Sequence, residues 1–341
     1  MKIRIVRFAG PVLLALVPMS ASMAEGPGSG TAADTNDAAT FEALRGVDVR
    51  MAGIAYRLTT ANAALCRRIA PTPGWVIHSL GQYDPKLRDV ARRVFGFDLP
   101  IAVEGVVPGA PAATAGVTAN DSIVSVDGKA VATTAPADAA TSNARDAALA
   151  IVAAAPADRA LTVVLDRGGA RRTVTIPASP GCKSNFEILL GDKMEASADG
   201  AIVQVGVRYF EKYDDDTLAV VVAHELAHNI LNHRARLDAA KVSRGLFAEI
   251  GRNGRLFRRS EDDADLLGMY LIRNAGYDPQ RAVAFWRDHG GDIDGGLFRS
   301  RTHRSSGARA KRIADEIARI PADAPTPYIP PILATRDEPL E

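Results

Sequence analysis

The chain has 341 residues, 47% of them hydrophobic, which is enough apolar material for one large domain or two smaller domains with buried cores. Its 41 Lys and Arg residues nearly balance its 40 Asp and Glu residues, so no charge excess points to nucleic acid or to an anionic surface. We therefore expect a globular protein with no nucleic-acid partner.

The first 24 residues have the layout of a secretory signal peptide. Three basic residues in the first seven precede an apolar segment at 8–19, and the small residues Ser22 and Ala24 follow at the spacing that a signal peptidase needs. The apolar segment is roughly 12 residues long and is interrupted by Pro11, whereas a membrane-spanning helix needs about 20. We expect residues 1–24 to be removed and the remaining chain to have no transmembrane segment. The protein is therefore expected to be periplasmic or secreted.

A linker and a long helix are expected next. Residues 25–40 are mostly Gly, Ala and polar residues without apolar periodicity, which is typical of a flexible linker. Apolar residues then recur at helical spacing between Phe41 and Ala70, which predicts one amphipathic helix in an N-terminal helical part at 41–84. The residues that set this spacing are Leu44, Val47, Met51, Ile54 and Leu58.

A β-rich unit is predicted from 85 to 180, because short runs rich in β-branched residues alternate there with turns. The predicted strands lie at 101–107, 122–128, 161–169 and 171–177, and a helical segment lies at 142–153.

Part of this unit, EGVVPGAPAATAGVTANDSIVSVDGKAV from Glu104 to Val131, resembles a PDZ domain. The matching features are a strand, a Pro-Gly turn, a short helix of small residues ending in Ala-Gly, an Asp before a strand, and an Asp-Gly turn. The resemblance implies a peptide ligand, often a C-terminus, that pairs with a sheet edge. The triplet Phe95-Gly96-Phe97 is either the carboxylate-binding loop or a simple turn in the core.

The stretch VVVAHELAHNILNH, from Val220 to His233, predicts a metal site on a helix. His224 and His228 are four residues apart, so they share one helix face and can bind one ion at about 2.1 Å. Glu225 is turned by about 100°, so it lies beside the ion and can take a proton from water. His233 lies five residues after His228, which is about 140° round the helix, so we expect His233 to face away from the metal and to be structural.

A catalytic zinc site usually has three protein ligands and a water, and the two histidines supply only two of the three, so a third protein ligand is expected elsewhere. Glu261 and Asp265 are four residues apart on another predicted helix and can face the same way. Taken alone, the acidic cluster that they form with Asp262 and Asp263 is better explained as a solvated N-terminal helix turn.

The two stretches together resemble the gluzincin metallopeptidases, the family of the CAAX prenyl endopeptidases, HtpX and BepA. That family pairs His-Glu-x-x-His with Glu-x-x-Ala-Asp, here Glu261 to Asp265, followed by Gly268 and a Gly-Tyr-Asp-Pro turn at Gly276 to Pro279. The resemblance implies one Zn²⁺ per chain held by His224, His228 and Glu261, with Asp265 bonded to the outer nitrogen of a ligand histidine.

Two further features follow from the family resemblance. Thr302, His303 and Arg309 match a later family stretch, with Arg304 in place of a proline. The resemblance implies that His303 either stabilises the oxyanion or blocks the metal in a latent state. The resemblance implies that the strand at 201–205 borders the cleft and pairs with an extended substrate through a free edge. An ordinary core strand is the alternative, and both can hold if one edge faces the cleft while the other joins the sheet.

The two cysteines, Cys66 and Cys182, flank the β-rich unit, and we predict a disulfide between them. An inserted domain leaves and re-enters its host at nearby points, so the flanks are expected to meet. Two buried free thiols are the alternative. The remaining tail, 321–341, is rich in proline and is expected to be extended.

The predicted fold class is α+β: a mainly helical zincin-type peptidase domain at 181–320 with a small sheet, completed by 41–84, plus an inserted β-rich PDZ domain. The predicted function is an exported zinc metalloendopeptidase that cleaves unfolded or misassembled proteins, with Glu225 as the base. The alternative is a PDZ-containing adaptor or chaperone with a structural or latent metal site, against which the intact Glu225 argues.

Overall fold

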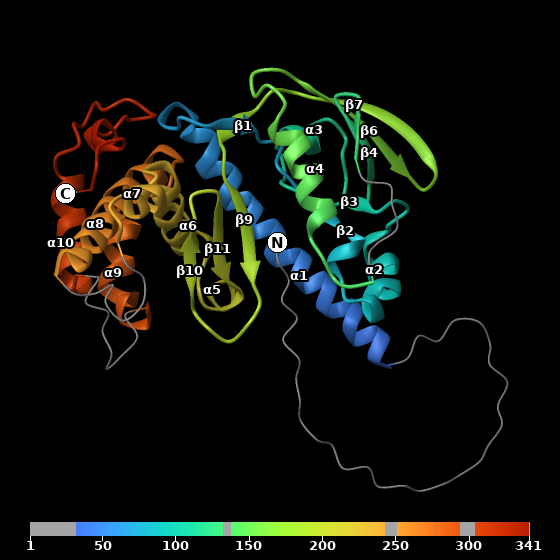
Figure 1. Cartoon of the computed structure of the whole chain (residues 1–341), viewed down its shortest axis with the longest axis horizontal. Helices are drawn as coiled ribbons and strands as arrows, with labels where there is room; N and C mark the ends of the chain where they lie inside the picture. The colour runs from blue at the N-terminus through green and yellow to red at the C-terminus, as the bar shows by residue number, and fades with distance from the viewer. Residues whose placement is uncertain (1–31, 132–137, 243–250, 294–303, 341) are drawn as a thin grey trace, which may run out of the picture.

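The computed structural model describes residues 32–131, 138–242, 251–293 and 304–340 (Figure 1). The predicted signal peptide, the first part of the predicted linker and His303 lie outside these residues. The described chain mixes helices and sheets, as predicted, in two modules. We call residues 75–176 the β-rich module, and α1 together with residues 185–340 the helical module.

Helix α1 (Ala32–Ala61) lies between the β-rich module and the rest of the helical module and contacts both of them (Figure 1). It begins inside the segment predicted as a linker and ends earlier than Ala70. The end is fixed by Asn62, whose Nδ2 donates to the carbonyls of Leu58 at 2.8 Å and Leu271 at 3.0 Å. A turn of 3-10 helix, η1 (Ala63–Leu65), follows, so Cys66 lies beyond the helix.

The β-rich module is built on one antiparallel sheet with the strand order β2-β3-β4-β6-β7, and β5 pairs with β4. Its strands are β2 (Trp75–Ser79), β3 (Ile101–Val106), β4 (Ser122–Val126), β5 (Lys129–Ala130), β6 (Leu161–Arg167) and β7 (Ala170–Ile176). The four predicted strands are all present. Strand β2 was not predicted, and it lies ahead of the predicted boundary at 85.

Helices cover the two faces of this sheet. On one face, Ile77 of β2 packs in an apolar cluster with Ala148 of α4 (Asn143–Ala153), the predicted helical segment. On the other face, His78 contacts the rings of Phe95 and Phe97 beside α2 (Arg88–Phe95) and α1. The remaining short helices are η2 (Leu80–Gln82), η3 (Pro85–Leu87) and α3 (Pro111–Thr114).

A three-stranded sheet belongs to the helical module, with β9 (Asn185–Leu189), β11 (Ile202–Gly206) and β10 (Ala196–Ala198). Strand β11 lies in the middle, antiparallel to β10 and parallel to β9. The expectation of a free edge on the strand at 201–205 is therefore wrong, because both edges of β11 are already paired. Among the described strands of this sheet, β10 and β9 form the edges.

The helices of this module enclose the larger apolar core. They are α5 (Val207–Lys212), α6 (Asp215–Ile230), α7 (His233–Ala239), α8 (Gly251–Asn274), α9 (Gln280–Ile293) and α10 (Ser306–Ile317). Helices α6 and α8 pack closely where Gly268 meets His224, since a Cβ at Gly268 would lie 3.2 Å from the Cα of His224. None of the described helices is both long and apolar enough to span a membrane.

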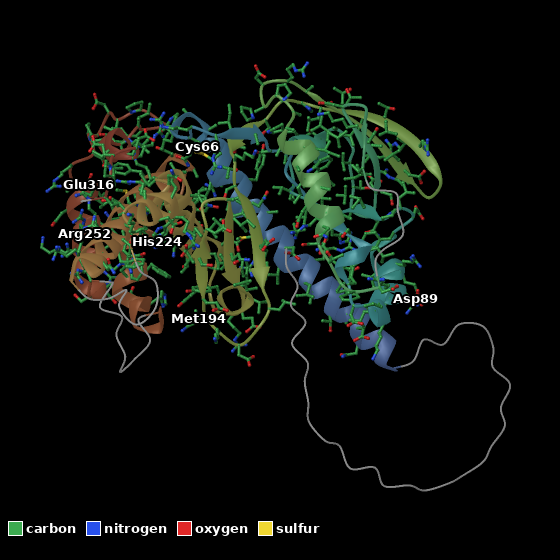
Figure 2. All side chains as sticks on the ribbon, in the orientation of Figure 1. Cys66, Asp89, Met194, His224, Arg252 and Glu316 are labelled. Carbon is green, nitrogen blue, oxygen red and sulfur yellow. A yellow bond between two sulfur atoms is a disulfide. The ribbon has the colours of Figure 1, made fainter. Side chains whose placement is uncertain are left out.

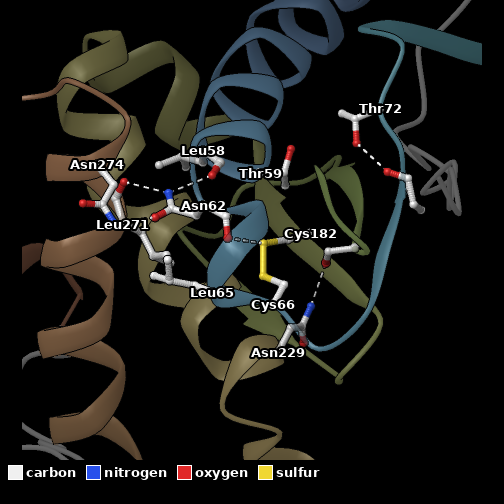
Figure 3. Close-up of a disulfide and its surroundings, with 12 residues drawn as sticks. Leu58, Thr59, Asn62, Leu65, Cys66, Thr72, Cys182, Asn229, Leu271 and Asn274 are labelled. Atoms are coloured by element: carbon white, nitrogen blue, oxygen red, sulfur yellow. Dashed lines mark hydrogen bonds between the residues drawn. A yellow bond between two sulfur atoms is a disulfide. The ribbon is translucent and has the colours of Figure 1, made fainter. Parts of the chain in front are cut away.

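The predicted disulfide between Cys66 and Cys182 is confirmed, with the two Cα atoms 5.4 Å apart (Figure 3). Just beyond it, β1 (Ile69–Pro71) pairs antiparallel with β8 (Pro180–Cys182), which brings Ile69 opposite Cys182. The chain thus enters and leaves the β-rich module at one point.

The tail from 321 is partly helical, through η5 (Pro331–Thr335), and it packs on the helical module. Leu333 joins the larger core, and Arg336 donates to the carbonyl of Leu65 at 2.5 Å. The proline-rich segment is therefore extended only in part, because apolar residues anchor it near the disulfide.

Candidate metal centre

Helix α6 carries the two histidines of the motif on one face, as predicted. Its first turn is fixed by Asp214, whose carboxylate accepts a hydrogen bond from the backbone N–H of Thr217 at 2.9 Å. The Nε2 atoms of His224 and His228 lie 3.2 Å apart. Figure 2 shows His224 among the helices, on the opposite side of the molecule from Asp89 in the β-rich module.

Glu261 of α8 completes a triangle with these two nitrogens. Its Oε2 lies 3.2 Å from Nε2 of His224, and its Oε1 lies 3.5 Å from Nε2 of His228. Tetrahedral bonds of about 2.1 Å place neighbouring ligand atoms about 3.4 Å apart, so the triangle has the dimensions of a zinc site. Within the described part of the chain, these three side chains are the one group with the spacing of metal ligands.

The charges around the site favour a cation. Burial lowers the pKa of His224, but hydrogen bonding to Asp265 and Glu261 outweighs burial and raises it to about 10. Burial lowers the pKa of His228 to about 4, and the charge of Glu261 opposes this only in part. The two carboxylates thus favour one positive charge at the site, either a proton on His224 or a bound cation that replaces this proton.

A second layer of charged residues holds His224 in place. Its Nδ1 lies 3.1 Å from Oδ1 of Asp265, which is an ion-pair distance, although the contact lacks the geometry of a hydrogen bond. Asp265 accepts two hydrogen bonds from Arg309 of α10, both at 2.6 Å, and all three groups are largely buried. Arg309 also stacks over Trp286, with its Cζ atom 3.3 Å from the ring centroid. This arrangement fixes the ring of His224 and keeps Asp265 ionised, since Arg309 and His224 lower its pKa despite burial.

A cavity of about 480 Å³ is lined by the three side chains and by Glu225. Strand β10 lines it as well, together with Gly200 in the turn after β10. The apolar part of the lining includes Tyr209, Val220, Val221, Phe285 and Trp286. The three candidate ligands, the Glu225 carboxylate and a strand at a sheet edge therefore meet in one cavity, which is an arrangement suited to metal-assisted hydrolysis of an extended chain.

His233 does not face away from the site, and that expectation is wrong. Helix α6 ends at Ile230, and Asn232 adopts a left-handed conformation with φ +54°. The new helix α7 starts at His233, so the rotation of α6 no longer applies. The ring of His233 instead returns to His228, with the two Nδ1 atoms 3.0 Å apart.

The other acidic residues of the cluster bond elsewhere. Asp262 accepts from Arg304 at 2.8 Å and also pairs with Arg312, while Asp263 faces Arg259 at 4.0 Å. Arg304, the residue that replaces the family proline, thus connects the chain after 303 to α8. His303 itself lies outside the described residues.

Sequence reasoning missed Asn229 and gave no role to Arg309. Asn229 accepts from the backbone N–H of Gly200 at 2.7 Å and donates to Ser184 at 2.8 Å, so it ties the β10–β11 turn to α6. The available signal was a polar residue on an otherwise apolar helix face. For Arg309 the available signals were its match to the family stretch and its place four residues before the buried Ile313, on the apolar face of α10.

The triplet Phe95-Gly96-Phe97 is a helix end and part of the core. Gly96 ends α2 with φ +56°, and its N–H donates to the carbonyl of Arg92 at 2.9 Å. Phe95 and Phe97 are buried with Tyr83 in an aromatic cluster. The interpretation as a carboxylate-binding loop is therefore wrong.

Comparison with known proteins identifies a PDZ domain in this chain. A PDZ domain model matches residues 103–154. Among solved structures, an HtrA-type protease, AlgW with decapeptide, is similar at 21% identity and a TM-score of 0.24, over 33% of this chain and 30% of that chain. The match thus spans less than a third of that protease. No curated protein matches in sequence. The β-rich module contains a PDZ domain, and the assignment of the helical module as a peptidase is a proposal.

Proposed function

We propose that the protein is an exported zinc metalloendopeptidase of the gluzincin type, which hydrolyses peptide bonds of unfolded or misassembled proteins. The observation that carries the proposal is the triangle of His224, His228 and Glu261, with sides of 3.2 to 3.5 Å, in one cavity with Glu225. A purely structural metal site has no need of a carboxylate base in its cavity.

The chain's own residues divide the chemistry among them. The two histidines and Glu261 would hold one Zn²⁺, which would supply Lewis-acid activation of a water and of the peptide carbonyl. Glu225 accepts the proton of the attacking water and transfers it to the leaving amine. Asp265 and Arg309 keep His224 oriented. His303 retains the two proposed roles, oxyanion stabilisation or blocking of the metal.

The substrate is proposed to pair with β10. This strand is an edge of its sheet and lines the cavity, and Asn229 holds the turn that follows it. An extended segment added to this edge brings a peptide bond past Glu225. Because pairing uses backbone groups, it selects unfolded segments over folded ones.

The PDZ domain is proposed to bind a peptide through β2, the edge strand of its sheet next to α4. A C-terminal segment of a substrate or of a partner is the ligand class that this mode accepts.

The test is the variant Glu225→Gln. The wild-type protein without its signal peptide is expected to contain about one zinc per chain and to cleave a reduced, unfolded protein. The variant is expected to keep the metal and to lose at least about 100-fold in cleavage rate, because removal of a general base costs that much. Metal analysis and a gel-based cleavage assay measure both.

Two outcomes would contradict the proposal. Cleavage by the variant at the wild-type rate would remove Glu225 from the mechanism. A wild-type protein that holds zinc but cleaves no unfolded protein would favour the adaptor or chaperone with a structural metal.

A further inference from the structure

His233 and His228 form a pair of buried rings at the metal centre. Their Nδ1 atoms lie 3.0 Å apart, and the ring centroids lie 4.9 Å apart. His233 is only 1% exposed. Through this contact, Nδ1 of His228 faces His233 at the start of α7, whereas Nε2 of His228 faces Glu261.

The direction of this hydrogen bond follows from the metal site. A neutral histidine that binds a metal through Nε2 carries its proton on Nδ1. Nδ1 of His228 must then donate, and Nδ1 of His233 must accept. His233 is therefore neutral, with its own proton on Nε2.

A role in packing alone does not explain a histidine at this position. Within the described residues, Nε2 of His233 is buried and has no hydrogen-bond partner. A buried polar group without a partner costs free energy, which an apolar side chain of similar shape would avoid. The acceptor on Nδ1 is what an apolar side chain cannot supply.

We propose that His233 is a positioning residue for the zinc site: its Nδ1 accepts the Nδ1–H of His228 and so fixes the tautomer and the ring orientation of that ligand. The inference rests on the proposed function. The two ligand histidines then differ in their outer partners, a buried carboxylate for His224 and a neutral imidazole for His228.

The test compares His233→Asn with His233→Leu. The two replacements have similar shapes, but only Asn presents an acceptor oxygen near the position of the lost Nδ1. Zinc affinity is measured by competition with a chromophoric chelator, and the melting temperature of each metal-free protein is measured in parallel. We expect His233→Leu to bind zinc about 10- to 100-fold more weakly, His233→Asn to stay within a few-fold of wild type, and the metal-free His233→Leu to melt no lower than His233→Asn.

Equal affinities for the two variants, whether both weakened or both unchanged, would overturn the inference and leave the zinc site itself intact. A wild-type protein that binds no zinc would overturn the proposed function as well. If His233→Leu does not fold, nitrogen-15 NMR of the zinc-loaded wild type decides: a proton on Nε2 of His233 supports the inference, and a proton on its Nδ1 overturns it.

Discussion

Four acidic residues lie within five positions of α8, and their partners give each a different role. Glu261 faces the Nε2 atoms of both histidines, and Asp265 lies against the outer nitrogen of His224 and Arg309. Asp262 and Asp263 face arginines instead. One helix turn thus separates the carboxylate that faces both Nε2 atoms from the carboxylate that contacts the outer nitrogen of His224.

This separation predicts different effects of alanine substitutions. Glu261→Ala is expected to weaken zinc binding by more than the roughly 10- to 100-fold that loss of an outer partner costs. Asp263→Ala, the matched control in the same helix turn, is expected to retain wild-type affinity. Metal content after dialysis against a chelator measures both. Equal metal loss in the two variants would reduce the acidic cluster to a general electrostatic effect.

Elements whose signals are local could be predicted from the sequence, and elements set by distant contacts could not. Helix α6 follows from its cap at Asp214 and its apolar run, and the strands of the β-rich module follow from their β-branched residues. The pairing of β2 with β3 and the central place of β11 depend on register between separate segments. His233 was misplaced because one left-handed residue, Asn232, ends the rotation on which the prediction relied.

The interface between α1 and the PDZ sheet buries a pair of carboxyl groups. Asp48 of α1 hydrogen-bonds Glu104 of β3, and their exposed fractions are 8% and 2%. Glu104 also lies 3.6 Å from Nδ1 of His78, which contacts the hydroxyl of Tyr83 at 3.0 Å, and Arg45 and Glu42 of α1 add nearby charges. Burial raises the pKa of Asp48 to about 7 and raises the pKa of Glu104 well above its usual range.

A pH dependence of stability follows from this pair. The folded protein retains protons that the unfolded chain releases near pH 4, so the free energy of unfolding decreases as the pH rises from about 4 to about 7. Asp48→Asn is expected to reduce the loss of stability between pH 5 and pH 8 by a few kcal/mol, because the amide stays neutral. Urea unfolding at the two pH values measures this, and Asp89→Asn on the exposed face of α2 controls for the lost charge. An unchanged pH dependence in Asp48→Asn would contradict the assignment.

On the scale of the whole molecule, three sets of contacts connect the PDZ domain to the helical module. The first is the α1 interface. The second is a buried ion pair between Arg145 of α4 and Glu187 of β9 at 3.0 Å, and Gln204 of β11 donates to the same carboxylate at 2.8 Å. The third is the β1–β8 pair with its disulfide. The PDZ domain is therefore held at several points, and one of them, Gln204, lies on the strand next to β10.

The disulfide closes the loop that contains the whole PDZ domain, and this predicts its effect on stability. Cys66 and Cys182 are 116 residues apart in sequence, and the Sγ of Cys182 lies 3.2 Å from the carbonyl of Asn62 in a buried site (Figure 3). Closing a loop of about 100 residues stabilises the fold by up to about 4.7 kcal/mol in the chain-entropy model.

The double variant Cys66→Ala/Cys182→Ala is expected to lose about 2–5 kcal/mol of unfolding free energy and to keep its zinc, since neither residue touches the candidate metal centre. Denaturant unfolding and metal analysis test this, with the wild-type protein in reducing agent as the matched control. An oxidised wild type and a double variant that unfold at the same denaturant concentration, or two labelled thiols in the denatured, unreduced wild type, would show that the bridge does not hold the two modules together.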